Sequence, residues 1–292
     1  MPTPLLTAVM PVTRMAGKLS HLEPLLDQCV SLGIEVVIIH DEQDSKTGDE
    51  LREILTQVDS KLITLITKTL HSPGKARNLG IAIAQGDWIC FWDSDDKPIP
   101  EDFLEMVHQA MNSNHEVALG KFRLIGEVVR KIYGNSETEI GRMPGIWRFA
   151  FKKEFLKGET FPDYRMGEDQ VFLARILVRT QKLFRYQSVV YEYSNINLGQ
   201  LTQNRIAILE LRFAIQDMLK IVSCSQGSVG IAPIFLSRQI ITLLKEGTLG
   251  IKLETFGFII KGVKNGGTSF LLTFLKEFSA AIKNQISLRR NH

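Results

Sequence analysis

Short apolar runs alternate with segments of helical spacing in the N-terminal third of the chain. The runs are rich in β-branched residues, and we expect strands over residues 5–11, 35–40, 62–67 and 88–92. Helices are expected between them, over residues 21–32 and 49–58 and from Pro73 up to Gly86, with Ser72 as the last helix's N-cap. This alternation predicts a parallel sheet covered by helices, which binds ligands at the carboxyl ends of its strands.

The alternation loosens after Pro100. We expect helices over residues 101–112 and 168–179, and strands over residues 116–123, 127–133, 145–151 and 188–193. Helical spacing dominates from Arg205 onward. The sequence therefore predicts an α/β domain over residues 1–205 and a helical region over residues 206–292.

The last part of the chain predicts a basic amphipathic helix. Residues 261–292 hold six Lys/Arg and one Glu, a net charge of +5. Six apolar residues share one helical face: Leu271, Phe274, Leu275, Phe278, Ile282 and Ile286. Such a helix either lies in the plane of a membrane surface or packs on the protein with its basic face in water.

Composition excludes several classes of protein. The net charge of +3 is too small to indicate nucleic-acid binding, and no apolar run is long enough to predict a membrane span. The three cysteines show neither a disulfide framework nor a CxxC pair, which fits a reducing compartment. The N-terminal residues lack a basic segment, so we expect a first strand there and no signal peptide.

Three carboxylates follow the fourth predicted strand, in the segment Asp93-Ser94-Asp95-Asp96. Two like charges about 5 Å apart repel by about 3 kcal/mol at an effective dielectric constant of about 20. The cluster therefore predicts a divalent cation, Mn²⁺ or Mg²⁺, with a phosphorylated ligand as its other partner. The alternative is an acidic turn in which one aspartate caps the following helix.

Three motifs occur in order along the chain. Residues 76–80 read Ala-Arg-Asn-Leu-Gly and precede the strand that ends in the aspartates; residues 167–169 read Gly-Glu-Asp and open a helix; residues 191–193 read Tyr-Glu-Tyr. In this order the chain resembles family 2 glycosyltransferases of the GT-A fold, a Rossmann-like mixed sheet flanked by helices. The resemblance covers residues 5–205 and implies an enzyme.

The resemblance implies roles for individual residues. Asp169, or Glu168 in its place, would be the catalytic base, and Asp95 with Asp93 and Asp96 would hold the metal. The nucleotide sugar would lie against Pro11, Val12, Thr13, Asp41, Arg77, Asp93, Ser94 and Asp95. Arg77 could pair with phosphate or with the acidic loop, and Asp41 could instead only cap its loop.

Two further positions, Trp147 and Arg148, are candidates for the acceptor site, since an indole can stack on a sugar. A tryptophan in such a position is more often part of the core. The chain departs from the family pattern at Thr13-Arg14 and at His40, which leaves the nucleotide base undetermined.

The function that the resemblance implies is metal-dependent, inverting transfer of a sugar, with UDP as the expected nucleotide. The acceptor would be a glycan or glycolipid of a bacterial-type surface polysaccharide. We expect a cytoplasmic protein, with peripheral membrane contact through residues 261–292. One alternative is a sugar nucleotidyltransferase, which would require a glycine-rich phosphate-binding loop after the first strand. Another is a glycan- or partner-binding protein without catalytic activity.

Overall fold

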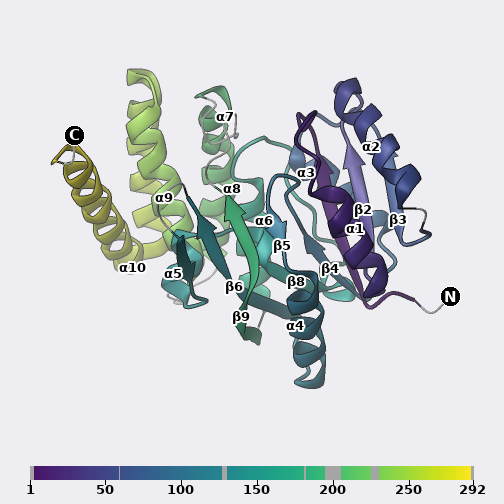
Figure 1. The fold of residues 1–292 in the computed structure, drawn as a ribbon. Coiled ribbons are helices and arrows are strands. Elements are labelled where there is room, and N and C mark those ends of the chain that lie inside the picture. The colour runs from purple at the N-terminus through teal and green to yellow at the C-terminus, as the bar shows by residue number, and fades with distance from the viewer. Residues whose placement is uncertain are drawn as a thin grey trace. The chain divides into compact units, whose positions relative to one another are not determined.

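A computed structural model describes residues 3–58, 60–126, 130–180, 182–194, 205–224 and 230–290 of the chain. The chain forms two compact units that interleave along the sequence (Figure 1). The first unit comprises residues 1–135, 146–163 and 180–198, and the second comprises residues 136–145, 164–179 and 199–292. The domain boundary at residue 205 stays a prediction.

The first unit is built on one sheet. Its strands are β1 (Leu6–Val12), β2 (Glu35–His40), β3 (Ile63–Thr67), β4 (Trp88–Phe91), β5 (Lys97–Pro98), β6 (Val117–Ile125), β7 (Arg130–Tyr133), β8 (Phe149–Lys152) and β9 (Leu183–Ser194). Its helices are α1 (Leu22–Ser31), α2 (Ser45–Gln57), α3 (Pro73–Ile83) and α4 (Pro100–Asn112), with short 3-10 turns at Ile146–Arg148 and Lys153–Leu156.

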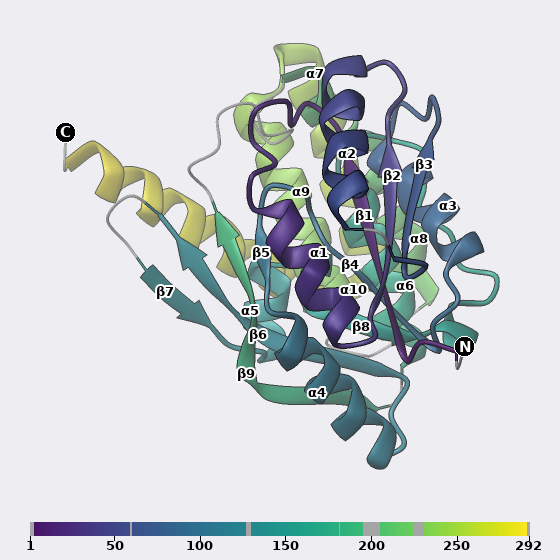
Figure 2. The ribbon, with the colours of Figure 1, turned by 45° about the vertical axis from the view of Figure 1, so that its right-hand side comes forward.

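The sheet is mixed. Its strand order is β3-β2-β1-β4-β8-β6-β9-β5, and β7 pairs with β6 outside this path. The strands β1 to β4 are parallel, β8 runs antiparallel to both β4 and β6, and β9 is parallel to β6. Figure 2 shows β6, β7 and β9 as neighbours. The expected parallel half is therefore present, and a half with both parallel and antiparallel pairs extends it.

Buried strands and close helix packing hold the parallel half together. All residues of β2 are buried, as the β-branched run predicts. Val37 and Ile39 of β2 pack against Ala76 of α3. A Cβ atom at Gly80 would lie 2.2 Å from Val9 Cγ1, so only glycine lets α3 approach β1 this closely.

The second unit is helical. It contains α5 (Glu137–Arg142), α6 (Glu168–Arg179), α7 (Arg205–Leu209), α8 (Leu211–Cys224), α9 (Ile231–Glu246) and α10 (Leu249–Arg290). Gly267 has φ 59° and ψ −150°, so α10 is two helical segments joined at this residue. No helix among the described residues is both long and apolar enough to cross a membrane.

Several expected bounds differ from the structure. Helix α2 begins at Ser45, four residues earlier than expected, because the Asp44 side chain accepts from the backbone N–H of Thr47 and caps it. The strand expected over residues 145–151 begins only at Phe149, after a 3-10 turn. The short strand β5 and helix α5 were not expected, since each is too short to carry a periodic pattern.

Candidate active site

The ends of three neighbouring strands bring the predicted donor residues to one edge of the sheet. Strand β1 lies between β2 and β4 and is parallel to both. The Asp41 N–H donates to the Val12 carbonyl at 3.4 Å, and the Trp92 N–H donates to the Val9 carbonyl at 3.0 Å. The loops that begin at Thr13, Asp41 and Asp93 therefore leave the sheet side by side, where open α/β sheets bind ligands.

Arg77 and Asp93 link α3 to the acidic loop. Arg77 Nη2 donates to Asp93 Oδ1 at 3.1 Å, and the guanidinium lies 5.5 Å from the centre of the Phe161 ring. Arg77 is 6% exposed, whereas the Asp93 side chain is 33% exposed. Of the two partners that the sequence left open for Arg77, the acidic loop is the one that the structure shows.

Strand β9 holds the acidic loop through two hydrogen bonds. The Tyr191 hydroxyl accepts a hydrogen bond from the Asp93 N–H at 3.0 Å, and the Ser194 N–H donates to Asp96 Oδ1 at 2.9 Å. The His21 ring nitrogen lies 2.9 Å from the Ser94 carbonyl oxygen. The sequence singled out Tyr191 only as part of the Tyr-Glu-Tyr motif. That motif is the one sequence feature that could have pointed to its contact with the acidic loop.

The three predicted metal ligands do not have equal surroundings. Asp96 is 2% exposed, and burial, with the negative charges of Asp93 and Asp95, raises the pKa of its carboxyl to about 8. Asp95 and Asp93 are partly exposed. The described residues hold no group of three His, Cys, Asp or Glu side chains arranged around a common point.

Asp95 and Asp93 fit a magnesium or manganese ion, because such ions are held by one or two carboxylates together with substrate phosphates. Asp96 does not fit, since its carboxyl is buried and engaged with the backbone of β9. The alternative of an aspartate that caps α4 is wrong, because the N-cap is Ile99 and no side chain caps this helix.

The start of α3 is fastened to the segment Phe161–Asp163. Ser72 caps α3 as expected, with its Oγ accepting from the Lys75 N–H at 3.2 Å. Asn78 exchanges two hydrogen bonds with the Phe161 backbone, at 2.9 and 2.7 Å, and Lys75 Nζ lies 2.7 Å from Asp163 Oδ2. Asn78 thus has the structural role that the sequence allowed, while Phe161 and Asp163 lack a local motif and were missed.

The loops after β1 and β2 are held by α2. The Met15 N–H donates to Thr47 Oγ1 at 3.0 Å, and the Arg14 N–H donates to the Asp44 carboxylate, with Arg14 at φ 57°. Pro11 is partly exposed, Val12 is 1% exposed and Thr13 is exposed. Asp41 Oδ1 accepts from the Gln43 N–H at 3.3 Å, so this residue at least caps its loop.

Trp147 and Arg148 lie in the core of the first unit. Trp147 is 6% exposed and stacks on Tyr191 and Tyr193, with ring centres 4.5 and 5.3 Å apart. Arg148 is 0% exposed and donates to the Gly134 carbonyl at 2.8 Å. Neither side chain offers the open face that stacking on an acceptor sugar requires. The core alternative given for the tryptophan therefore describes Trp147, and Arg148 is buried as well.

Glu168 and Asp169 open α6 in the second unit. Gly167 has φ 83°, and a Cβ atom there would lie 2.9 Å from Ala214 Cβ on α8. Glu168 is 5% exposed, and Asp169 is partly exposed, with its Oδ1 accepting from the Gln170 N–H at 2.8 Å. The glycine of the motif therefore serves the packing of α6 against α8, and Asp169 is the more accessible of the two acids.

A cavity of about 730 Å³ lies elsewhere in the first unit. Trp88, the first residue of β4, and Lys152, the last residue of β8, line it. Since Asp93 follows the other end of β4, this cavity is not part of the candidate site.

Comparison with known proteins identifies the family. The glycosyl transferase family 2 model matches residues 13–174. The chain belongs to glycosyl transferase family 2. This membership confirms the expected family and overturns the nucleotidyltransferase alternative.

A relative of the chain supports the same assignment. The succinoglycan biosynthesis protein ExoO of Rhizobium meliloti is 26% identical over 168 residues, a match to 49% of this chain and 47% of that protein. The chain thus matches about half the length of this curated relative.

Two solved structures show the fold. The family 2 chain superposes on S. aureus TarS 1-349 in complex with UDP-GlcNAc with a TM-score of 0.69 and 14% identity, covering 96% of this chain and 92% of the other. The mannosyltransferase PcManGT from Pyrobaculum calidifontis, in complex with GDP-Man and Mn²⁺, gives a TM-score of 0.53 and 14% identity, covering 94% and 87%. The expected GT-A fold with a helical C-terminal region is confirmed.

Proposed function

We propose that the chain is an inverting glycosyltransferase, which moves a sugar from a nucleotide-diphosphate donor to a hydroxyl of a glycan or glycolipid. The observation that carries this proposal is the acidic loop at the carboxyl edge of the sheet, braced by Arg77 and Tyr191. A loop held from two sides presents Asp95 in a fixed position. The biosynthesis of a surface polysaccharide is the proposed setting, as the name of the succinoglycan relative suggests.

The donor is proposed to bind over the ends of β1, β2 and β4. Pro11, Thr13 and Asp41 would lie near the base and ribose, and Asp93, Ser94 and Asp95 near the diphosphate. Of the two similar solved structures, one is a complex with UDP-GlcNAc and the other is a complex with GDP-Man and Mn²⁺. UDP is the nucleotide proposed here, and Asp95 with Asp93 would hold Mg²⁺ or Mn²⁺. When bound, this ion would neutralise charge on the leaving diphosphate.

Asp169 is the proposed base. The acceptor oxygen forms a bond with the anomeric carbon while the bond from that carbon to the diphosphate breaks, which inverts the configuration. The hydroxyl proton passes to the Asp169 carboxylate, and the nucleoside diphosphate leaves with the bonding electrons. Asp169 is preferred to Glu168 because Glu168 is 5% exposed whereas Asp169 is partly exposed. Both acids lie in the first turn of α6, where the helix dipole favours an ionised carboxylate.

Substitution of Asp169 tests the proposal. Asp169→Asn should lower transfer by about 10²–10⁴-fold, the usual contribution of a positioned base, and leave donor binding unchanged. The matched control is Asp49→Asn, an exposed carboxylate on α2. Transfer would be measured with UDP-, GDP-, CDP- and dTDP-sugars, each with Mn²⁺, Mg²⁺ or a chelator. Full activity of Asp169→Asn would exclude this base, and absence of donor binding under all conditions would favour the binding-protein alternative.

Contact with a membrane surface is proposed for α10, at the cytoplasmic face. Each segment of this helix exposes apolar residues at positions i, i+4, i+7 and i+11, which form one stripe per segment: Leu249, Leu253, Phe256 and Ile260, then Leu271, Leu275, Phe278 and Ile282. Leu249 is 77% exposed and Ile260 is 70% exposed. Phe274, which the sequence placed on the same face, is 7% exposed and packs inward.

Lysines occur along both segments of α10: Lys252, Lys261, Lys264, Lys276 and Lys283. An anionic lipid surface is therefore the proposed partner. Vesicles with phosphatidylglycerol should sediment the wild-type protein, and vesicles of phosphatidylcholine alone should not. Leu253→Glu with Leu275→Glu should abolish the sedimentation, whereas Val178→Glu, at an exposed apolar residue of α6, should not. Equal sedimentation of all variants would exclude the contact.

A further inference from the structure

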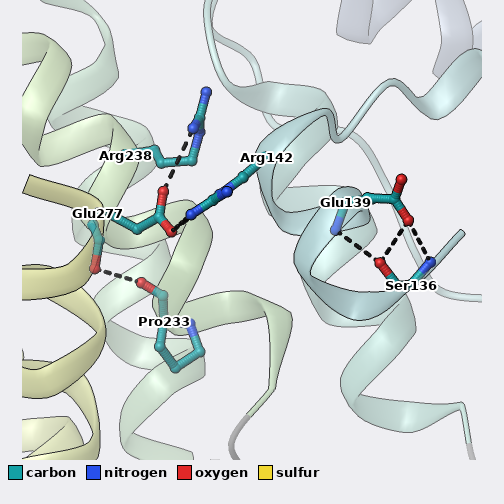
Figure 3. A network of polar contacts seen from close by, with 7 residues as sticks. Ser136, Glu139, Arg142, Pro233, Arg238 and Glu277 are labelled. Carbon is teal, nitrogen blue, oxygen red and sulfur yellow. Dashed lines mark hydrogen bonds and ion pairs between the residues drawn. The ribbon is translucent and has the colours of Figure 1, made fainter. Parts of the chain in front are cut away.

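One buried carboxylate in the second unit is shared by two arginines. Glu277 of α10 is 5% exposed, and its Oε1 accepts from Arg142 Nη2 at 3.1 Å and from Arg142 Nε at 3.3 Å. Arg238 Nη1 of α9 lies 3.6 Å from the other oxygen, Oε2. Figure 3 shows both guanidinium groups directed at this one side chain. Glu277 thus fixes two cations that come from separate helices.

The cluster carries more positive charge than its own carboxylate can balance. Lys245, in the last turn of α9, lines the same cavity, so three cations face one carboxylate and the net charge is +2. Glu139 of α5 does not compensate, because its carboxylate accepts from the Ser136 hydroxyl at 2.6 Å in the capping box at the other end of α5 (Figure 3). Burial, together with the neighbouring Arg142 charge, lowers the pKa of Arg238 despite Glu277.

The cations open onto a cavity of about 280 Å³. Thr242 lines the wall with its hydroxyl donating to the Arg238 carbonyl at 3.0 Å, and Ala280 and Ala281 of α10 are small enough to leave room beside the charges. The side chains of Arg142 and Arg238 are 41% and 44% exposed, so part of each guanidinium remains accessible while Glu277 holds the rest. Fixed guanidinium groups of this kind match the geometry of phosphate oxygens.

We propose that the cavity between α5, α9 and α10 is a binding site for a phosphate group, a monoester or a diester, held by Arg142, Arg238 and Lys245. Glu277 is the internal counterion that orients the two arginines before the ligand binds. The site lies wholly within the second unit, and the inference does not depend on the proposed donor or on transfer. The phosphate could belong to a soluble molecule or to a lipid headgroup, and the experiment distinguishes these sources.

Inorganic phosphate is the first probe, titrated into the full-length protein at constant ionic strength with chloride as the replaced anion. Saturable binding should raise the melting temperature of the wild-type protein. Lys245→Gln should weaken binding about tenfold, as expected for loss of one charge-assisted contact. Lys220→Gln removes an exposed lysine of α8 outside the cavity and should bind phosphate like the wild type.

A second variant guards against misfolding. Arg238→Gln alone leaves Glu277 with one partner fewer, so it is combined with Glu277→Gln, which makes the pair neutral. This double variant should fold, as judged by far-UV circular dichroism, and should bind phosphate at least about tenfold more weakly. Equal phosphate affinity of the wild type, Lys245→Gln and the double variant, or no saturable binding by the wild type, would overturn the proposal.

Vesicles identify the source of the phosphate. Phosphatidylcholine vesicles with and without phosphatidic acid are offered to the wild type and to Lys245→Gln. Binding that requires phosphatidic acid, is lost in Lys245→Gln and is competed by inorganic phosphate indicates a lipid headgroup. Lys245-dependent binding of inorganic phosphate without such vesicle binding indicates a soluble ligand. Vesicle binding that Lys245→Gln leaves unchanged belongs to the apolar stripes of α10 and not to this site.

Discussion

Arg77 Nη2 lies 3.1 Å from Asp93 Oδ1, and this ion pair joins the helix before β4 to the acidic loop after it. The two residues are sixteen positions apart in the chain. The arginine is buried and the aspartate is partly exposed, so the pair holds the base of the loop while the partly exposed Asp95 remains in reach of a ligand. The loop is therefore placed before any donor binds.

Arg77→Met should destabilise the first unit by about 1–3 kcal/mol, because a buried partner of a charged hydrogen bond is lost. Urea unfolding followed by tryptophan fluorescence measures this, since all three tryptophans, Trp88, Trp92 and Trp147, belong to the first unit. Arg52→Met is the control. Its partner Asp49 is 2.6 Å away, but both side chains are more than half exposed, and such pairs contribute about 0–1 kcal/mol. Equal losses in the two variants would mean that the Arg77 pair has no special role in stability.

Tyr191→Phe should leave the partly buried Asp93 N–H without its acceptor. We expect a loss of about 1–3 kcal/mol in the free energy of unfolding, and weaker metal-dependent donor binding because the loop is less well held. Tyr133→Phe removes a hydroxyl from a ring that stacks on Phe122 with centres 4.8 Å apart, and it should change stability by less than about 0.5 kcal/mol. If Tyr191→Phe binds the donor and unfolds like the wild type, β9 does not support the loop in the way described.

Gly80→Ala should destabilise the protein by about 1–3 kcal/mol, because the new methyl group would meet the Val9 side chain at 2.2 Å. Gly257 is the matched glycine, since it also lies within a helix but a Cβ atom there meets nothing within 4 Å. Gly257→Ala should stabilise by about 0.5–1 kcal/mol through helix propensity. Thermal denaturation followed by circular dichroism gives both values, and effects of the same sign would contradict the packing argument.

Asp44 should make stability depend on pH. Burial raises the pKa of its carboxyl, but hydrogen bonds from Thr47 and the Arg14 N–H lower it by more, so the net pKa is below the usual value. A carboxyl whose pKa is lowered by folding contributes stability that is present above its unfolded pKa, about 3.9, and is lost as the pH falls through the folded pKa.

The variants Asp44→Ala and Asp44→Asn test this dependence. At pH 7, Asp44→Ala should lose about 1 kcal/mol as an uncapped helix, and Asp44→Asn should lose less because an amide oxygen still caps. Below about pH 4 the wild type should approach Asp44→Asn, since both then carry a neutral side chain. Urea midpoints measured from pH 7 down to pH 3 check the order, and a constant gap between the wild type and Asp44→Asn would contradict it.

The sequence by itself determined the parallel half of the sheet and the family. Strand β2 and helix α6 have the expected bounds, Glu35–His40 and Glu168–Arg179, because a buried β-branched run and an apolar helical periodicity are local signals. The motif order was sufficient to place the chain in family 2. The position of the acidic loop at a strand end also followed from the sequence alone.

Only the tertiary structure decided what each acidic or aromatic side chain contacts. Asp96 and Asp95 are neighbours of the same type, yet Asp96 is directed to the Ser194 N–H and is buried, since β9 arrives from almost a hundred residues away. Trp147 is likewise enclosed by rings from other strands, Phe122 of β6 and Tyr191 and Tyr193 of β9. Burial and charge depend on which distant segments pack together, and a local pattern carries no information about that.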